Sequence, residues 1–245
     1  MTPAVLRTLR ILDHLARHGA QRLSDLAREF ALPKSNIHRL LQSLAEEGFV
    51  EQEENTGRYL ASMKVYELGA MIANRNPVRR AAAPFVQQLH QATGETVALA
   101  ILTDTDIVYI DRILSPNPLR GSLREGFRVP AAFTAAGKVM LAHHPDGDAL
   151  LDRILSGVPE AIDLVREDIF EEFETIRRQG YAVSRGGWTR GINSIACVIC
   201  EREAIPTAAL ALVVPTERMP DELIPSAALK VMGACEKING LFQLR

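Results

Sequence analysis

The sequence predicts an α+β protein with a small helical N-terminal part and a larger C-terminal part that mixes strands and helices. Three observations lead to this prediction: apolar stripes at helical spacing in the first 50 residues, a helical stretch at residues 62–77, and strand-like runs after Gly94. A mixture of strands and helices without repeated βαβ units is typical of this class. The length of 245 residues fits one large or two modest domains.

The first part is predicted to contain three helices. Residues 4–18 form the first, and Gly19 ends it. Two more helices lie within residues 23–47, where Ser24 is expected to cap the start of one. Pro33 blocks the continuation of that helix and suits the first turn of the next. The apolar stripe of the last helix consists of Ile37, Leu40, Leu41 and Leu44.

The opposite face of this last helix is polar and partly basic. Residues 34–45 contain no acid, whereas Glu46 and Glu47 follow at once, so the N-terminal half is expected to approach DNA. A helix fits the major groove, where arginine pairs with guanine and glutamine or asparagine pairs with adenine. The candidate DNA-binding residues of this helix are Lys34, Ser35, Asn36, His38, Arg39, Gln42 and Ser43. The alternative is an ordinary helical hairpin with a solvated outer face.

A small hairpin is predicted to follow the three helices. Residues 48–51 and 58–60 are strand-like, and Asn55, Thr56 and Gly57 form the turn between them. Three helices and a hairpin make a winged helix-turn-helix. Arg58 is the cation of this wing and is surrounded by acids, so it is the residue expected to contact DNA phosphate there.

The rest of the chain is predicted to begin with a stiff connector. A helix at residues 64–74 precedes one at residues 78–93 that is broken near Pro84. Strands are expected at residues 96–102, 107–113, 181–184, 192–200 and 208–214, helices at 134–144, 148–156, 168–179 and from 220 onward, and an extended segment at 119–127. The predicted division is therefore 1–61 for the DNA-binding domain, 62–77 for the helical linker and 78–245 for the second domain.

Composition excludes several classes of protein. The chain is 47% hydrophobic and 24% charged, which is normal for a globular protein with a core, and its net charge of −2 requires any DNA contact to come from a local patch. We expect no membrane contact, because no apolar run is long enough to span a bilayer. Arg7 and Arg10 interrupt any signal-peptide pattern, and three cysteines argue against a disulfide framework. A reducing cytoplasm is the expected location.

Known catalytic motifs are missing from the sequence. It contains no phosphate-binding glycine signature, no HExxH and no GxSxG, so we expect no catalytic residues and no cofactor. Cys197 and Cys200 spell CxxC, but residues three apart on a strand face opposite sides, so no metal site is expected. An enzyme built on the C-terminal domain and a protein-interaction adaptor remain the alternatives to a DNA-binding regulator.

One loop near the end of the chain has an unusual composition. Residues 184–193 contain the single tryptophan and two arginines among glycines. Trp188 could stack on a ring, and Arg190 or Arg185 could pair with a carboxylate. The alternative is that Trp188 covers the core and both arginines are solvated.

Several of these segments, taken in order, resemble the IclR family of bacterial transcriptional regulators. The resemblance covers nearly the whole chain. It is carried by residues 4–12, 23–44, 48–50, 57–60, 129–142, 180–183 and 191–196. It implies a winged helix-turn-helix followed by a GAF-like effector-binding domain. It also implies homodimers, or dimers of dimers, that bind double-stranded operator DNA, and a small carboxylic or aromatic acid that sets the DNA affinity.

The resemblance also implies positions for the effector pocket. Ala135 and Ala136 fall at a helix start whose amides can hold a carboxylate, and Val129 and Ile192 fall at apolar wall positions. Ser184 and Ser194 stand where some relatives carry an acid and a cysteine, and these departures favour neutral hydroxyl donors. With the two candidates from the loop, the predicted effector-binding set is Val129, Ala135, Ala136, Ser184, Trp188, Arg190, Ile192 and Ser194.

Overall fold

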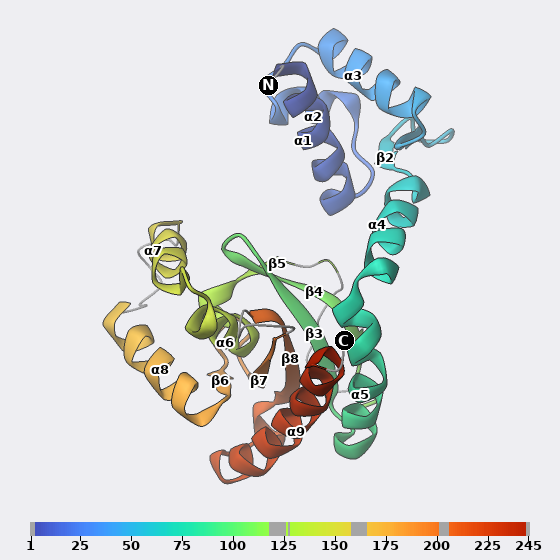
Figure 1. Ribbon diagram of the computed structural model, residues 1–245. Coiled ribbons are helices and arrows are strands. Elements are labelled where there is room, and N and C mark those ends of the chain that lie inside the picture. The colour runs from blue at the N-terminus through green and yellow to red at the C-terminus, as the bar shows by residue number, and fades with distance from the viewer. Residues whose placement is uncertain (1–2, 118–125, 127, 158–165, 201–205, 244–245) are drawn as a thin grey trace. The chain divides into compact units, whose positions relative to one another are not determined.

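The computed structural model describes residues 3–117, 126, 128–157, 166–200 and 206–243. The chain divides into two compact units, Met1–Arg75 and Asn76–Arg245, whose elements are labelled in Figure 1. Within the described residues, no helix is both long enough and apolar enough to cross a membrane.

The N-terminal unit is a helix-turn-helix with a β-hairpin wing, as the sequence predicts. Its elements are α1 (Pro3–His18), α2 (Leu23–Glu29), α3 (Lys34–Glu46), β1 (Val50–Gln52), β2 (Tyr59–Ala61) and α4 (Met63–Arg75). The strands β1 and β2 pair antiparallel. One buried cluster joins the three helices to the hairpin and consists of Ile11, Leu15, Leu26, Ile37, Leu41, Leu44, Val50 and Tyr59. The apolar stripe of α3 therefore faces this core.

The helix starts differ slightly from prediction. Ser24 does not cap α2, because the extended backbone ends at Arg22 (φ −79°, ψ 148°) and helical geometry already begins at Leu23. Pro33 is the residue before α3, and it makes no side-chain cap. Ala31 between the two helices has a φ of 49°, which is uncommon for a residue with a side chain and turns the chain sharply.

The C-terminal unit is built on a six-stranded antiparallel sheet. The strands are β3 (Thr96–Thr103), β4 (Asp106–Ile113), β5 (Arg128–Pro130), β6 (Ala182–Arg185), β7 (Ile192–Cys200) and β8 (Pro206–Pro215). Their spatial order is β5-β4-β3-β8-β7-β6. Two strands that are distant in the sequence, β3 and β8, pair at the centre of the sheet. Their pairing runs from Thr96 opposite Val213 to Ala100 opposite Ala209.

Helices cover both faces of this sheet (Figure 1). The helices α6 (Ala135–His143), α7 (Gly147–Gly157) and α8 (Arg166–Gln179) share one buried cluster with it, and α5 (Pro77–Thr93) and α9 (Ile224–Gln243) share the other. The predicted α+β architecture is thus confirmed.

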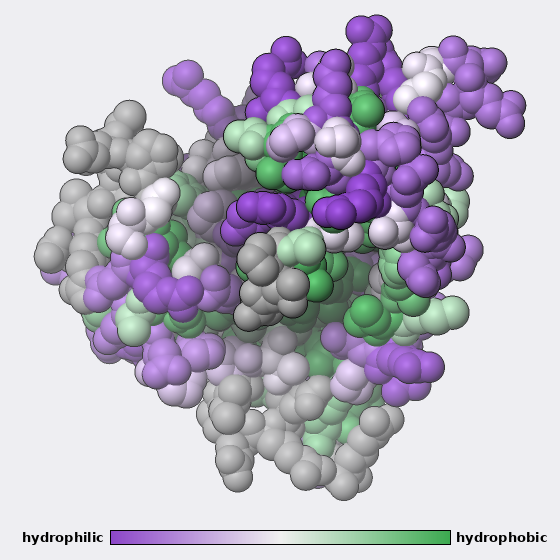
Figure 2. Space-filling view, turned by 90° about the horizontal axis from the view of Figure 1, so that it is seen from above, coloured by the Kyte–Doolittle hydropathy of each residue, from purple (hydrophilic) through white to green (hydrophobic). Residues whose placement is uncertain are grey.

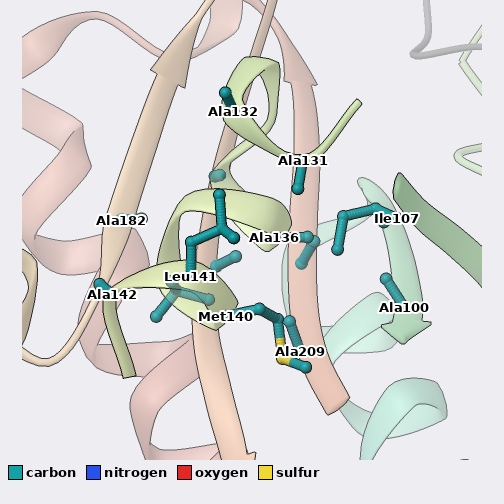
Figure 3. Close-up of a cluster of buried hydrophobic side chains, with 14 of the residues drawn as sticks. Ala100, Ile107, Ala131, Ala132, Ala136, Met140, Leu141, Ala142, Ala182 and Ala209 are labelled. Atoms are coloured by element: carbon teal, nitrogen blue, oxygen red, sulfur yellow. The ribbon is translucent and has the colours of Figure 1, made fainter. Parts of the chain in front are cut away.

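The two faces of the sheet differ in side-chain size. On the α6 side β3 and β8 present Ala98, Ala100, Ala209 and Ala211, whereas on the other side they present mainly larger aliphatic residues. Figure 3 labels two of these alanines, and it shows Ala209 beside Met140 of α6. Helix α6 also packs tightly against the short 3-10 helix η1 (Ala131–Phe133), since a Cβ at Gly137 would lie 2.0 Å from the carbonyl oxygen of Ala131.

The C-terminal unit differs from prediction at one helix. The helix α5 is not broken at Pro84 but runs through it, because Val78, Ala82, Val86 and Leu89 bury one continuous face. That burial offsets the backbone bond which an internal proline removes. The extended segment expected at residues 119–127 lies, apart from residue 126, outside the described residues.

Candidate nucleic-acid interface and ligand pocket

The candidate DNA-reading residues of α3 all lie on its solvent-exposed face. Lys34, Ser35, Asn36, His38, Arg39, Gln42 and Ser43 are exposed. The Ser43 hydroxyl donates to the carbonyl of Arg39 over 3.2 Å, so its proton already has a partner. The Arg39 guanidinium makes no ion pair or hydrogen bond with the described residues. Its five N–H donors are therefore free for a ligand outside the chain.

The C-terminal end of α3 is fixed to the start of α4. The Lys64 ammonium donates to the carbonyl of Glu47 over 2.5 Å and lies 4.6 Å from the centre of the Phe49 ring. The Ser62 hydroxyl donates to the carbonyl of Gly48. A cation at a helix C-terminus is favourable because the last carbonyls are unpaired. These contacts hold the first turn of α4 against the end of the reading helix.

The wing presents little positive charge. Arg58 is half-buried, and its backbone amide donates to the Thr56 hydroxyl over 3.2 Å. That hydroxyl in turn donates to the carboxylate of Glu53. Glu51 and Glu54 are exposed. The acids would repel phosphate, so the geometry favours a shallow wing contact through Arg58.

Large apolar side chains are exposed elsewhere in this unit. Figure 2, which views the whole molecule from one side, shows both hydrophilic and apolar side chains on its surface. Helix α4 has no buried residue, and Met63, Tyr66 and Ile72 are 66%, 68% and 73% exposed. The full set on α1 and α4 is Val5, Leu9, Met63, Tyr66, Leu68, Met71 and Ile72. Such a concentration of exposed apolar side chains is typical of a surface that another protein covers.

A cavity of ≈ 70 Å³ lies in the C-terminal unit at one end of the sheet. It is lined by Tyr109, Val129, Phe133, Thr134, Ser184, Trp188, Thr189, Ile192, Ser194 and Val213. Five predicted residues line it together, namely Val129, Ser184, Trp188, Ile192 and Ser194. They come from β5, β6, β7 and the loop between the last two. Distant segments thus converge on one small hollow.

The start of α6 lies beside this cavity. Thr134, a lining residue, caps the helix by accepting a hydrogen bond from the Gly137 amide over 2.9 Å. Ala135 and Ala136 form the first turn and are 0% and 1% exposed, and their side chains are not among those that line the cavity. Any contact with a ligand would be through their backbone amides, which lie at the positive end of the helix dipole.

Trp188 lines the cavity and is partly exposed to solvent. It is 47% exposed and meets the Phe133 ring edge-on, with 6.0 Å between the ring centres. The preceding Gly187 allows this close packing, because a Cβ there would lie 2.5 Å from the Phe133 carbonyl oxygen. The predicted position of Trp188 over a pocket is therefore compatible with the structure.

Arg190 lies elsewhere. It lines a separate open hollow of ≈ 470 Å³ together with Arg185 and Asp221, and Arg185 pairs with Asp221 at 2.9 Å. Gly186 and Gly191 have φ of 66° and 81°, so the chain reverses within this loop and its residues face two sides. Contrary to expectation, the structure does not bring Arg190 together with Trp188.

Tyr109, Phe133, Thr134, Thr189 and Val213 also line the cavity but were not predicted from the sequence. Phe133 and Thr134 lie inside the segment 129–142 that carries the family resemblance, which is a signal that could have identified them. Tyr109 and Val213 carry no such signal. Strand alternation gives the face on which each lies, but only the strand order β4-β3-β8-β7 brings them to the same hollow.

Two hydroxyls of the cavity, those of Ser184 and Thr134, are bonded to the backbone. The Ser184 hydroxyl donates to the Phe133 carbonyl over 3.0 Å. Burial raises the pKa of Tyr109 to about 12, although the neighbouring Thr134 hydroxyl lowers it. Tyr109 is consequently a neutral hydrogen-bond donor and acceptor at physiological pH.

Cysteines and acids form no metal centre in the described part of the chain. No group of three or more His, Cys, Asp or Glu side chains is arranged there to hold an ion. Cys197 and Cys235 are buried in the cluster under α5 and α9, and the Cys235 thiol donates to the Cys197 carbonyl at 3.7 Å. Burial raises the pKa of the Cys235 thiol well above its usual value.

Two family models match this chain. The model described as the bacterial transcriptional regulator IclR C-terminal domain matches residues 70–239, and that of the IclR helix-turn-helix domain matches residues 4–54. The chain is 30% identical over 224 residues to the HTH-type transcriptional regulator XynR of Escherichia coli, which covers 89% of this chain and 88% of that protein.

Solved structures are similar over the full length. The IclR of Thermotoga maritima has 25% identity, a TM-score of 0.76 and coverage of 99% of both chains. An IclR homolog of Microbacterium hydrocarbonoxydans, solved in complex with 4-hydroxybenzoate, has 24% identity and a TM-score of 0.82, with coverage of 99% of this chain and 100% of that chain. These structures share the fold described above.

Proposed function

Because the chain belongs to the IclR family of bacterial transcriptional regulators, we propose that a small organic acid in the cavity beneath Trp188 sets its affinity for operator DNA. The family is one of DNA-binding regulators with a C-terminal effector domain, and not one of enzymes. In this proposal residues 1–61 bind DNA, residues 62–77 form the linker, and residues 78–245 bind the effector.

The exposed face of α3 supports its role as the reader of the operator. Arg39 and Gln42 have the side chains that pair bidentately with guanine and adenine in the major groove. Lys34, Ser35, Asn36, His38 and Ser43 surround them on the same exposed surface, and Arg58 of the wing contacts phosphate. The single observation that carries this assignment is that Ile37, Leu41 and Leu44 are buried while every candidate on α3 is exposed.

The residues that line the cavity support the proposal that the effector is an acid. The cavity combines aromatic walls, hydroxyls and the positive end of α6, which together suit a small carboxylate. The Microbacterium homolog, whose structure contains the aromatic acid 4-hydroxybenzoate, supports the same class of ligand. Trp188 stacks on the ligand, Val129 and Ile192 form its apolar wall, Ser184 and Ser194 provide hydroxyls, and the amides of Ala135 and Ala136 face its carboxylate.

A second copy of the chain is the proposed partner of the exposed apolar residues on α1 and α4. A dimer presents two reading helices, which can bind half-sites about one helical turn apart. Two such dimers can pair into a tetramer. Since the start of α4 is held against the end of α3 through Lys64, α4 provides a rigid path for movement to reach the reading helix.

The experiment that tests this function combines DNA binding with a panel of small acids. An operator is first selected from genomic fragments, and its affinity is then measured by fluorescence anisotropy with and without each acid. We expect at least one monocarboxylate both to raise the melting temperature and to change the operator affinity. Tight DNA binding that no acid alters would contradict the proposed effector, whereas failure to retain any fragment would contradict the proposed reader.

A further inference from the structure

The hydroxyls of Tyr109 and Thr134 form a pair in the wall of the cavity. The Thr134 side chain lies close enough to lower the pKa of Tyr109, and both residues line the hollow. The Thr134 oxygen also accepts the Gly137 amide at the start of α6. Two hydroxyls carry two protons, and at most one of them can join the two hydroxyls to each other. At least one hydroxyl proton of the pair is therefore left for a ligand in the cavity.

The neighbouring Ser184 cannot supply that donor, because its proton is already bonded. Its hydroxyl donates to the Phe133 carbonyl, so only its lone pairs remain for a ligand. Ser194 on β7 and the exposed Thr189 in the loop before it make no side-chain hydrogen bond to the described residues. The hydroxyl donors of the cavity therefore differ in their surroundings. The Tyr109–Thr134 pair is the one connected to the positive end of a helix.

Charge is sparse around the cavity. Among its described lining residues there is no Lys, Arg, His, Asp or Glu. Neutral donors and a helix start can compensate one negative charge, but a second buried charge would lack any partner, which is costly. A cationic group would find no acid at all among these residues.

We propose that the Tyr109–Thr134 pair donates to the carboxylate of the effector and that the cavity selects monocarboxylates over dicarboxylates and amines. This inference deepens the proposed function and rests on it. The cavity of ≈ 70 Å³ is about half of the roughly 150 Å³ in which an engineered protein cavity binds benzene. Its volume therefore favours a small aliphatic acid over an aromatic one.

The test uses Trp188, the one tryptophan of the sequence, as an intrinsic fluorescent probe. The full-length protein is titrated with pyruvate, benzoate, phthalate and benzylamine, and each titration is repeated by thermal shift. We expect saturable binding of at least one of the two monocarboxylates and at least tenfold weaker binding of phthalate and benzylamine. Equal binding of phthalate would overturn the charge selection.

The matched variants are Tyr109→Phe and Tyr181→Phe. Both remove one tyrosine hydroxyl, but Tyr181 packs against the cluster on the other side of the sheet. We expect Tyr109→Phe to weaken monocarboxylate binding at least tenfold, and both Tyr181→Phe and Thr134→Ser to leave it within about threefold, since a buried hydrogen bond to a charged group is a strong one. Thr134→Ser keeps both the hydroxyl and the helix cap.

The outcomes separate this inference from the proposed function. A Tyr109→Phe variant that is folded and binds the acid as tightly as the parent would overturn the inference, while the acid-controlled DNA binding would stand. If the parent binds neither pyruvate nor benzoate, the acid effector itself fails and the inference fails with it.

Discussion

The reading helix and the ligand cavity use polar side chains in opposite ways. On α3 they stand on the exposed face of a rigid helix, and the Arg39 guanidinium has no partner among the described residues. In the cavity, the hydroxyls of Ser184 and Thr134 bond to the backbone. An exposed site keeps its binding groups free because water replaces the missing partner, whereas a buried site must satisfy them within the fold.

This difference implies that the two sites can be damaged separately. The reading helix depends on the identity of its exposed residues, and the cavity depends on close packing around α6. A substitution at one site should therefore leave the other site unchanged.

The largest effect is expected from Gly137→Ala. The added Cβ would lie 2.0 Å from the Ala131 carbonyl oxygen, so α6 must move away from η1 and the cavity loses its wall. We expect the C-terminal unit to lose about 3 kcal/mol or more of its free energy of unfolding, measured by urea denaturation with Trp188 fluorescence. Gly233→Ala is the control, because its Cβ has open space within α9. Equal stability of the two variants would contradict tight packing at η1.

The next effect is expected from Arg39→Ala. Loss of a bidentate contact should weaken operator binding by about 1–3 kcal/mol and relax the preference at one base pair, with no change in melting temperature or acid binding. Arg10→Ala on α1 is the control, since Arg10 is also exposed but lies outside α3. Competition binding with single-base operator variants measures the change. An Arg39→Ala protein with unaltered base preference would show that α3 is not read at this position.

A smaller effect concerns alkaline pH. Burial raises the pKa of Tyr109 from 10.0 to about 12, so the folded protein keeps a proton that the unfolded chain loses between these values. The stabilisation is fully present below pH 10 and is lost as the pH rises through 12. At pH 11 the free energy of unfolding should fall by about 1 kcal/mol more in the parent than in Tyr109→Phe. Parallel pH profiles of the two proteins would show that Tyr109 is not buried in solution.

The smallest effect is expected from Arg58→Ala in the wing. A single phosphate contact should change affinity for operator and unrelated DNA alike, and reduce the slope of log affinity against log salt by about 1. Titrations at several salt concentrations measure this slope. A loss confined to the operator would indicate that Arg58 reads a base instead, which would sharpen the contrast between wing and α3.

Much of the N-terminal unit could be predicted because its signals are local. The spacing of Ile37, Leu41 and Leu44 determines which face of α3 is buried, and so which residues are exposed. Ser24 shows the limit of this reasoning, because its preference for a cap was overridden by a helix that begins at Leu23. Pro84 shows the same on α5, where packing of the buried face outweighs a local helix breaker.

The sequence by itself determined the order of the elements, the face of α3 that meets solvent and the family of regulators to which the chain belongs. Only the tertiary structure decided that Tyr109 and Thr134 share a cavity with Trp188 while Arg190 lies in another hollow. The physical reason is range: helical periodicity acts over a few residues, but a cavity is formed where strands distant in sequence pair side by side. The reversal of the chain between Gly186 and Gly191 then determines which loop residues face it.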